Sequence, residues 1–372
     1  MKPLLKKILI IAIVSAVVVI ALVLGLVLGL RKKDDDKVGR RKKNDDSNVL
    51  NSYDNTEELI RKYPVINPTT VLEGIEKNIQ NRLLTGFENW NRGFDTWKAW
   101  GNILYTNESI YNVHGARLSL SSYQAAMDIS LKQQTILMGD FHNMLITGEF
   151  AAIHYDFLSG AVGAKKEDLR KSRVMEFVKF KDYGNELGTR VEEGWGSTKD
   201  TSGEGLKQGF QADKEKAEQE EQDIYIQNYL IPTTSNLKEK YIIKYHTEYR
   251  DTNAEDILQI ILEGFDRWNN GILSYLPWVD SVYDTNAKSS SLDERDRTMD
   301  EYKTEIEELF SKEVIEKLFF DNILIRENWA GLHYRYRREI KETHEKSFGD
   351  RMQFLKFEEK EGALKITGSW IQ

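Results

Sequence analysis

The chain has 372 residues and a net charge of −8, with 40% hydrophobic and 11% aromatic residues and no cysteine. This length suggests two domains, and the apolar content is too high for a disordered chain. The lack of cysteine excludes disulfides, thiolate zinc sites, iron–sulfur clusters and cysteine nucleophiles. The acidic balance argues against a protein that binds nucleic acid, because such a protein needs a basic surface.

An uncharged segment lies near the start of the chain, at residues 8–30, and consists of Ile, Val, Leu, Ala, Gly and a single Ser. A helix that rises ~1.5 Å per residue over this segment spans a hydrocarbon core of ~30 Å. A secretory signal peptide has a shorter apolar run and ends in a small-residue cleavage site. The segment therefore predicts a transmembrane helix at 8–30, followed by a charged, polar stalk at 31–56.

The charges that flank this segment predict its orientation. Lys2, Lys6 and Lys7 precede it, and eight Lys and Arg residues follow it between positions 31 and 43. Because loops rich in Lys and Arg stay in the cytoplasm, we expect a single-pass protein whose globular part is cytoplasmic. The extracytoplasmic alternative is supported by the lack of cysteine and by a glycosylation sequon that starts at Asn107.

The rest of the chain carries one module twice. Gly86–Tyr105 (GFENWNRGFDTWKAWGNILY) aligns without a gap with Gly264–Tyr283 (GFDRWNNGILSYLPWVDSVY). The shared residues include two tryptophans and a tyrosine, which rarely coincide by chance. Residues 141–157 match 320–336 at nearly the same offset, and MEFVKF at 175–180 matches MQFLKF at 352–357. This repeat predicts a first module at 57–200, a linker at 201–235 and a second module at 236–372.

Each module is predicted to open with helices and to close with strands. Apolar residues spaced by three and four predict a helix over 72–90, with a second copy at 257–268, and a glycine follows each helix. A further helix is expected from about Ser121, with its counterpart at 299–319. The expected strands are 143–147, 149–157, 174–180 and 189–195, then 322–325, 328–336, 352–357 and 364–370. This order predicts an α+β fold with helices packed on a curved, mainly antiparallel sheet.

The pattern resembles the SnoaL-like group within the nuclear transport factor 2-like superfamily. The residues that carry the resemblance are Gly86-Phe87 and Trp90-Asn91, Tyr105, the strand that ends Ala151-Ala152-Ile153-His154-Tyr155, the MEFVKF strand and Trp195. The resemblance implies two tandem cone-shaped α+β barrel modules, each with an apolar pocket between helices and sheet. It also implies frequent dimerisation through the sheet. Members include polyketide cyclases, ketosteroid-type isomerases, hydrolases and non-catalytic binding or scaffold modules.

Two histidines at matching positions are candidate catalytic residues. Strand alternation places His154 on the same face as Asp156, and a histidine oriented by an acid can serve as a general base. Residues two apart on a strand lie ~7 Å from each other, however, and the second copy pairs His333 with Arg335 instead of an acid. We therefore favour an interpretation in which both histidines lie on the outer face of the sheet, at a contact between the modules.

Several aromatic residues are candidates for a ligand pocket. The resemblance places polar aromatic groups near the mouth of the cone, which suggests Tyr105, Trp195, Tyr283 and Trp370. Trp100 and Trp278 are expected to pack in the cores, with pocket lining as the alternative. Asp128 together with Tyr105 would supply a carboxylate base and an oxyanion donor of the ketosteroid type. His114, Glu192 and Glu193 are further possible acids or bases.

Two functions stay open. The chain has no GxGxxG, GxxxxGK[ST], GxSxG or HExxH motif, and its histidines show no metal-ligand spacing, so we expect neither cofactor nor metal. The favoured function is a membrane-tethered, non-catalytic pair of modules that binds an apolar small molecule or acts as a scaffold. The alternative is an isomerase or cyclase that acts on a polyketide-like or steroid-like carbonyl compound. Tethering at ~mM effective concentration should also pair the modules into an internal pseudo-dimer, in which Asp156 and Arg335 could face each other.

Overall fold

A computed structural model describes residues 56–64, 72–113, 116–184, 188–198, 234–245, 247–290 and 295–372. The predicted transmembrane helix at 8–30 lies outside these residues, as do the stalk up to position 55 and the linker up to position 233. In the ranges that the structure describes, no helix is both long enough and apolar enough to cross a membrane.

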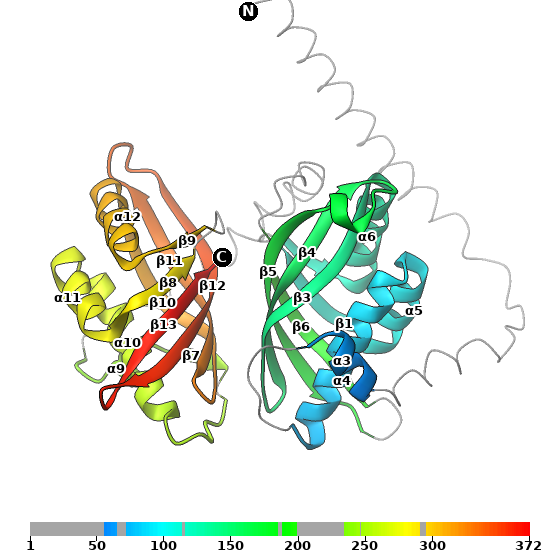
Figure 1. Cartoon of the computed structure of the whole chain (residues 1–372), viewed down its shortest axis with the longest axis horizontal. Helices are drawn as coiled ribbons and strands as arrows, with labels where there is room; N and C mark the ends of the chain where they lie inside the picture. Colours follow the sequence, from blue (N-terminus) through cyan, green and yellow to red (C-terminus); the bar gives the residue numbers. More distant parts are fainter. Residues whose placement is uncertain are drawn as a thin grey trace, which may run out of the picture. The chain divides into compact units, whose positions relative to one another are not determined.

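The first half of the described chain, residues 56–198, builds one mixed sheet with helices packed against it (Figure 1). The sheet has the strand order β2-β1-β6-β5-β4-β3, and β1 and β6 are its parallel pair. The elements are α3 (Thr56–Lys62), α4 (Gly74–Asn91), α5 (Phe94–Leu104), β1 (Tyr105–Val113), β2 (Ala116–Ser119), α6 (Leu120–Gln133), β3 (Gln134–Thr147), β4 (Phe150–Ala161), β5 (Arg170–Asp182) and β6 (Thr189–Thr198), with a short 3-10 turn at Lys166–Asp168.

The second half, residues 234–372, repeats this plan (Figure 1). Its sheet has the order β7-β10-β11-β12-β13-β8-β9, with parallel pairs β7–β10 and β8–β13. The elements are α9 (Leu237–Lys240), β7 (Ile243–Tyr245), α10 (Ala254–Asn269), α11 (Ile272–Val282), β8 (Tyr283–Ser290), β9 (Asp296–Arg297), α12 (Met299–Lys312), β10 (Glu313–Arg326), β11 (Trp329–Ile340), β12 (Lys346–Lys360) and β13 (Ala363–Ile371). The predicted α+β class is confirmed, with sheets that are mixed and mainly antiparallel.

The repeated Trp-Asn pair attaches the first long helix of each half to its sheet. In the first half the Trp90 indole donates to the main-chain oxygen of Ile136 at 3.1 Å, and Trp268 donates to Ile315 at 2.7 Å in the second. The asparagine that follows each tryptophan donates to a main-chain oxygen and accepts from the main-chain N–H of the same strand residue. This residue is Met138 for Asn91 and Lys317 for Asn269. The sequence identity therefore reflects one shared hydrogen-bond arrangement.

Two features of the fold differ from the prediction or go beyond it. The helix predicted at 299–319 ends at Lys312, because residues 313–326 form β10 and pair along β11. The apolar residues of this segment fit both periods, and pairing across the sheet decides between them. The helices α5 and α11 were not predicted, although Trp97, Trp100 and Leu104 lie at helical spacing and are buried.

Strand alternation divides each sheet between two cores. In β4, Ala151, Ile153 and Tyr155 face the helices of their own half. Ala152, from the opposite face, joins a separate cluster to which both halves contribute. The members of this inter-sheet cluster are Leu145, Ala152, Met175, Phe177, Trp195, Leu324, Trp329, Met352 and Phe354.

Candidate functional site

Each half contains a cavity between its helices and its sheet, and the two cavities differ in size. The first has a volume of about 60 Å³ and the second about 430 Å³. Small-molecule pockets generally measure about 300–1,000 Å³, whereas the smaller volume has room only for a few water molecules. Of these two cavities, the one in the second half is large enough to accept an organic ligand.

The small cavity encloses a carboxylate among tyrosines. The Tyr155 hydroxyl donates to Glu176 Oε1 at 2.7 Å, and the Tyr111 hydroxyl also bonds this carboxylate. Burial raises the pKa of Glu176, and the two hydroxyls offset part of that rise. The sequence analysis did not propose Glu176 as a site residue. Strand alternation could have indicated it, because Glu176 lies between Val174 and Val178 on the face of β5 that is turned to the helices.

Tyr111 accounts for the small volume of the first cavity. Its ring lies directly over Gly194, where an added Cβ would stand 2.5 Å from the ring carbon Cδ2. Ser289 occupies the corresponding position in the second half. Tyr111 of β1 pairs with Gly194 of β6, and Ser289 of β8 pairs with Ser369 at the matching place in β13. A serine in place of the tyrosine leaves the space open.

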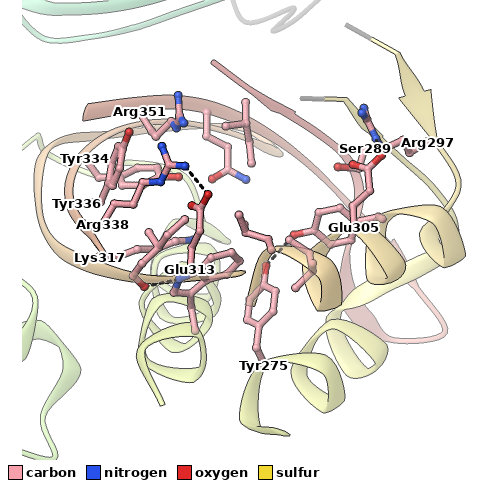
Figure 2. A pocket seen from close by; sticks show the side chains of 17 residues that line it. Tyr275, Ser289, Arg297, Glu305, Glu313, Lys317, Tyr334, Tyr336, Arg338 and Arg351 are labelled. Carbon is pink, nitrogen blue, oxygen red and sulfur yellow. Dashed lines mark hydrogen bonds and ion pairs between the residues drawn. The ribbon is translucent and has the colours of Figure 1, made fainter. Parts of the chain in front are cut away.

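The large cavity combines an aliphatic and aromatic lining with charged groups (Figure 2). Two ion pairs form part of its lining, Arg297 with Glu305 and Arg338 with Glu313. The hydroxyls of Tyr275 and Tyr302 are hydrogen-bonded at 2.8 Å. The charged and amide side chains that line it are Arg297, Glu305, Glu313, Lys317, Arg338, Arg351 and Gln353.

Lys317 is a buried amine at this cavity. Its Nζ lies 4.2 Å from the ring centre of Trp268, 4.4 Å from that of Phe265 and 5.4 Å from that of Tyr334. Burial lowers the pKa of Lys317 to about 7. The predicted helix at 299–319 concealed this residue, because a lysine on a charged helix is usually exposed to solvent.

The two candidate histidines line neither cavity. His154 is buried on the opposite face of its sheet, with its ring centre 5.6 Å from that of Phe354 in the second half. His333 is likewise buried, 5.5 Å from the ring of Phe177 in the first half. Burial lowers the pKa of His154 to about 3, so this imidazole is neutral at physiological pH. Both rings lie where the sheets of the two halves meet.

The candidate acids are engaged by basic groups of their own halves. Asp156 accepts from His142 Nε2 at 2.7 Å and pairs with Lys171. Burial alone would raise the pKa of Asp156, but these two contacts outweigh it and lower the pKa. Arg335 contacts Asp321 at 2.5 Å. Asp156 and Arg335 thus each have an oppositely charged partner within their own half.

Tyr105 and Asp128 do not form the expected acid–oxyanion pair. Tyr105 lines the small cavity, whereas Asp128 lies on α6, does not line that cavity and bonds Lys132 at 2.7 Å. Glu192 pairs with Lys179, Glu193 accepts from Asn112 at 3.1 Å, and His114 lies outside the described residues.

The aromatic residues predicted for a pocket fall into three groups. Trp100 lines the small cavity beside Tyr105. Tyr283 belongs to the core between the helices and the sheet of the second half, Trp278 packs against that core, and neither lines the large cavity. Trp195 belongs to the inter-sheet cluster and Trp370 packs against it, so neither faces a cavity.

Comparison with known proteins gives a likeness of fold alone. No family model matches the sequence, and no curated protein matches it. A ketosteroid isomerase-like protein from Erwinia carotovora atroseptica SCRI1043 is 10% identical, with 33% of this chain and 96% of that chain covered and a TM-score of 0.28. A protein from Jannaschia sp. CCS1, described as a SnoaL-like polyketide cyclase, is 12% identical, with 35% and 91% covered and a TM-score of 0.27.

An NTF2-like protein of unknown function from Pseudomonas putida KT2440 is 12% identical, with 33% of this chain and 85% of that chain covered and a TM-score of 0.25. Each match thus extends over about a third of this chain and most of the solved protein. At these identities and scores, the matches indicate no activity for this chain.

Proposed function

We propose that the protein is a tandem pair of SnoaL-like modules that binds a small molecule without chemical conversion, in the cavity of its second half. The observation that carries this proposal is the contrast between a cavity of about 430 Å³ in the second half and one of about 60 Å³ in the first. The large cavity presents an aliphatic and aromatic lining with a few polar groups, which is the usual composition of a ligand pocket.

The distribution of the acids supports binding over catalysis. A ketosteroid-type reaction needs a carboxylate base in contact with the substrate. Glu176 could act as such a base, but it lies in the half whose cavity is small. The aligned residue at the large cavity is Gln353, an amide that cannot accept a proton at neutral pH. The two glutamates that do line the large cavity are each paired with an arginine.

The alternative function, an isomerase or cyclase, is supported by Glu176 with its two tyrosine hydroxyls. A carboxylate of raised pKa beside hydroxyl donors could exchange a proton with a carbonyl substrate. Such a substrate would have to displace the Tyr111 ring from Gly194. The two functions are separated by turnover of an unsaturated ketone, which only the enzyme would isomerise and only with Glu176 intact.

The binding function is tested on the full chain reconstituted in lipid nanodiscs. Solvent extraction followed by mass spectrometry should recover a small molecule, and the neutral dye 1-aminoanthracene should bind with increased fluorescence. Leu309→Trp fills the cavity and should weaken dye binding by tenfold or more. Val314→Trp is the matched control, since Val314 lies in the same half, on β10, and is exposed. Equal dye binding by wild type and Leu309→Trp would contradict the proposal.

We further infer that the two modules pack through their sheets as an internal pseudo-dimer. Arg326 donates to Glu76 Oε2 at 2.8 Å and to the main-chain oxygen of Ile146 at 3.1 Å; the Glu76 side chain is buried and that of Arg326 is partly buried. The inter-sheet cluster and the contact of His154 with Phe354 add apolar and aromatic contacts between the halves.

Residues 8–30 are proposed to anchor the pair in a membrane, with the modules on the cytoplasmic side. The full chain should then stay in the membrane pellet after carbonate extraction. Protease added to intact cells should leave the modules uncut, and digestion without permeabilisation would place them on the extracytoplasmic side.

A further inference from the structure

The large cavity contains more positive than negative side chains. Four basic residues and two glutamates line it, and Arg297 and Arg338 are paired with those glutamates. Lys317 and Arg351 remain, and in the part of the chain that the structure describes neither forms an ion pair, although the neighbouring Asp350 interacts electrostatically with Arg351. The guanidinium of Arg351 lies 5.2 Å from the ring centre of Tyr336.

The two cations come from β10 and β12, the strands on either side of β11. Figure 2 shows Lys317 and Arg351 on the same side, with Ser289 and Arg297 on the other. Tyr334 lies next to both of them. It pairs with Arg351 in the register of β11 and β12, and its ring centre lies 5.4 Å from Lys317 Nζ. Aliphatic side chains, including Ile306, Leu309 and Ile371, line other parts of the wall.

A buried cation is unfavourable without a counter-charge, and aromatic faces compensate only in part. A ligand that carries an anion would supply the missing charge, while its apolar body would occupy the aliphatic part of the cavity. We propose that the cavity binds an organic carboxylate with an apolar body, and that Lys317 and Arg351 hold its carboxylate. This inference rests on the proposed binding function and specifies the class of ligand.

The proposal has a consequence for pH. A carboxylate placed beside Lys317 favours the protonated amine, whose pKa without ligand is about 7. Binding therefore takes up a proton, and affinity falls as pH rises above about 7. The other titratable and charged groups at this cavity are Glu313 from β10, Tyr334, Tyr336 and Arg338 from β11, Arg351 from β12, Tyr275 from α11, Tyr302 and Glu305 from α12, and Arg297 from β9.

The test is isothermal titration of the full chain in lipid nanodiscs with 6-phenylhexanoate and with its neutral amide. At pH 6.5 the wild type should bind the carboxylate at least tenfold more tightly than the amide. Its affinity for the carboxylate should fall on the order of tenfold by pH 8.5, where the amine is mostly neutral. Lys317→Met should abolish both effects. Methionine suits this position, because the corresponding residue of the first half is Met138.

Lys288→Met removes an exposed lysine from the same half and should change neither effect. Arg351→Gln is the second variant, and it should weaken carboxylate binding while affinity for the amide stays within about twofold. Equal affinity of the wild type for acid and amide would overturn the inference and leave the binding function intact. Failure of both probes, together with no effect of Leu309→Trp on the dye, would overturn the binding function itself.

Discussion

Lys317 and Met138 occupy corresponding positions in the two halves, and each lines the cavity of its own half. This single difference places an amine in one cavity and a thioether in the other. The main chain at each position is held by an asparagine side chain, Asn91 in the first half and Asn269 in the second. The backbone arrangement is therefore kept, while a thioether in one half becomes an ionisable amine in the other. Such a buried amine lowers the stability of the fold whenever it must carry a proton.

Replacement of this amine by methionine should stabilise the protein in a pH-dependent way. The unfolded lysine keeps its proton up to a pKa of 10.5, whereas the folded amine loses it above about 7. Between these values the unfolded state binds more protons, so wild-type stability rises with pH. The gain in the free energy of unfolding for Lys317→Met should be on the order of 5 kcal/mol below pH 7 and should shrink towards pH 10.

Urea unfolding at pH 6.5 and 9.5 measures this gain, with Lys288→Met as the control for an exposed lysine. A gain that is the same at both pH values would show that Lys317 is not held in a low-pKa environment.

At the scale of elements, a glycine allows each helix pair to pack closely. The Trp100 ring of α5 lies on Gly86 of α4, and Trp278 of α11 lies on Gly264 of α10. An added Cβ at Gly264 would stand 2.6 Å from the Trp278 ring. The glycine and the tryptophan were both found in the sequence repeat, and the structure shows that they form one contact in each half.

Gly86→Ala should therefore destabilise the protein by about 1–3 kcal/mol, because the indole has to move out of a packed core. Gly101→Ala is the matched control within α5, where the nearest atom to an added Cβ is Gln124 Nε2 at 3.4 Å. That change should be neutral, or stabilising by up to about 1 kcal/mol, since alanine favours helix more than glycine does. Thermal unfolding compares the two variants, and equal melting temperatures would contradict the packing argument.

At the scale of the whole molecule, the contact between the two sheets should decide whether the halves unfold together. An added Cβ at Gly331 would stand 3.0 Å from Ala152 Cβ and 3.4 Å from both Leu145 and Phe177, all in the first half. Gly331→Leu should force these faces apart and cost about 1–3 kcal/mol. We expect the wild type to unfold in a single transition and the variant in two steps.

Ala363→Leu, at an exposed position of β13, is the control for added apolar volume. Calorimetry and light scattering together show whether the halves have separated or the chain has associated. A single, unshifted transition for Gly331→Leu would argue against the internal pseudo-dimer.

Local properties of the chain were sufficient to predict much of this architecture. The duplication is visible in aligned tryptophans, and helix α4 is visible in the spacing of its apolar residues. Strand alternation placed His154 and Tyr155 on opposite faces of β4, where the structure also has them. The helix and the strand faces depend on neighbours within a few residues, and the duplication is a match between two stretches of one chain, so a single sequence is enough to show all three.

Only the tertiary structure revealed the two cavities and their chemistry. The first cavity is closed because Tyr111 meets Gly194, a residue that the sheet brings beside it from far along the chain. The helix α12 ends at Lys312 because β11 pairs with the segment that follows. Lys317 is buried only in that strand, among rings from α10 and β11. Burial, cavity volume and pKa depend on groups that meet only after folding, so no local pattern in the sequence could predict them.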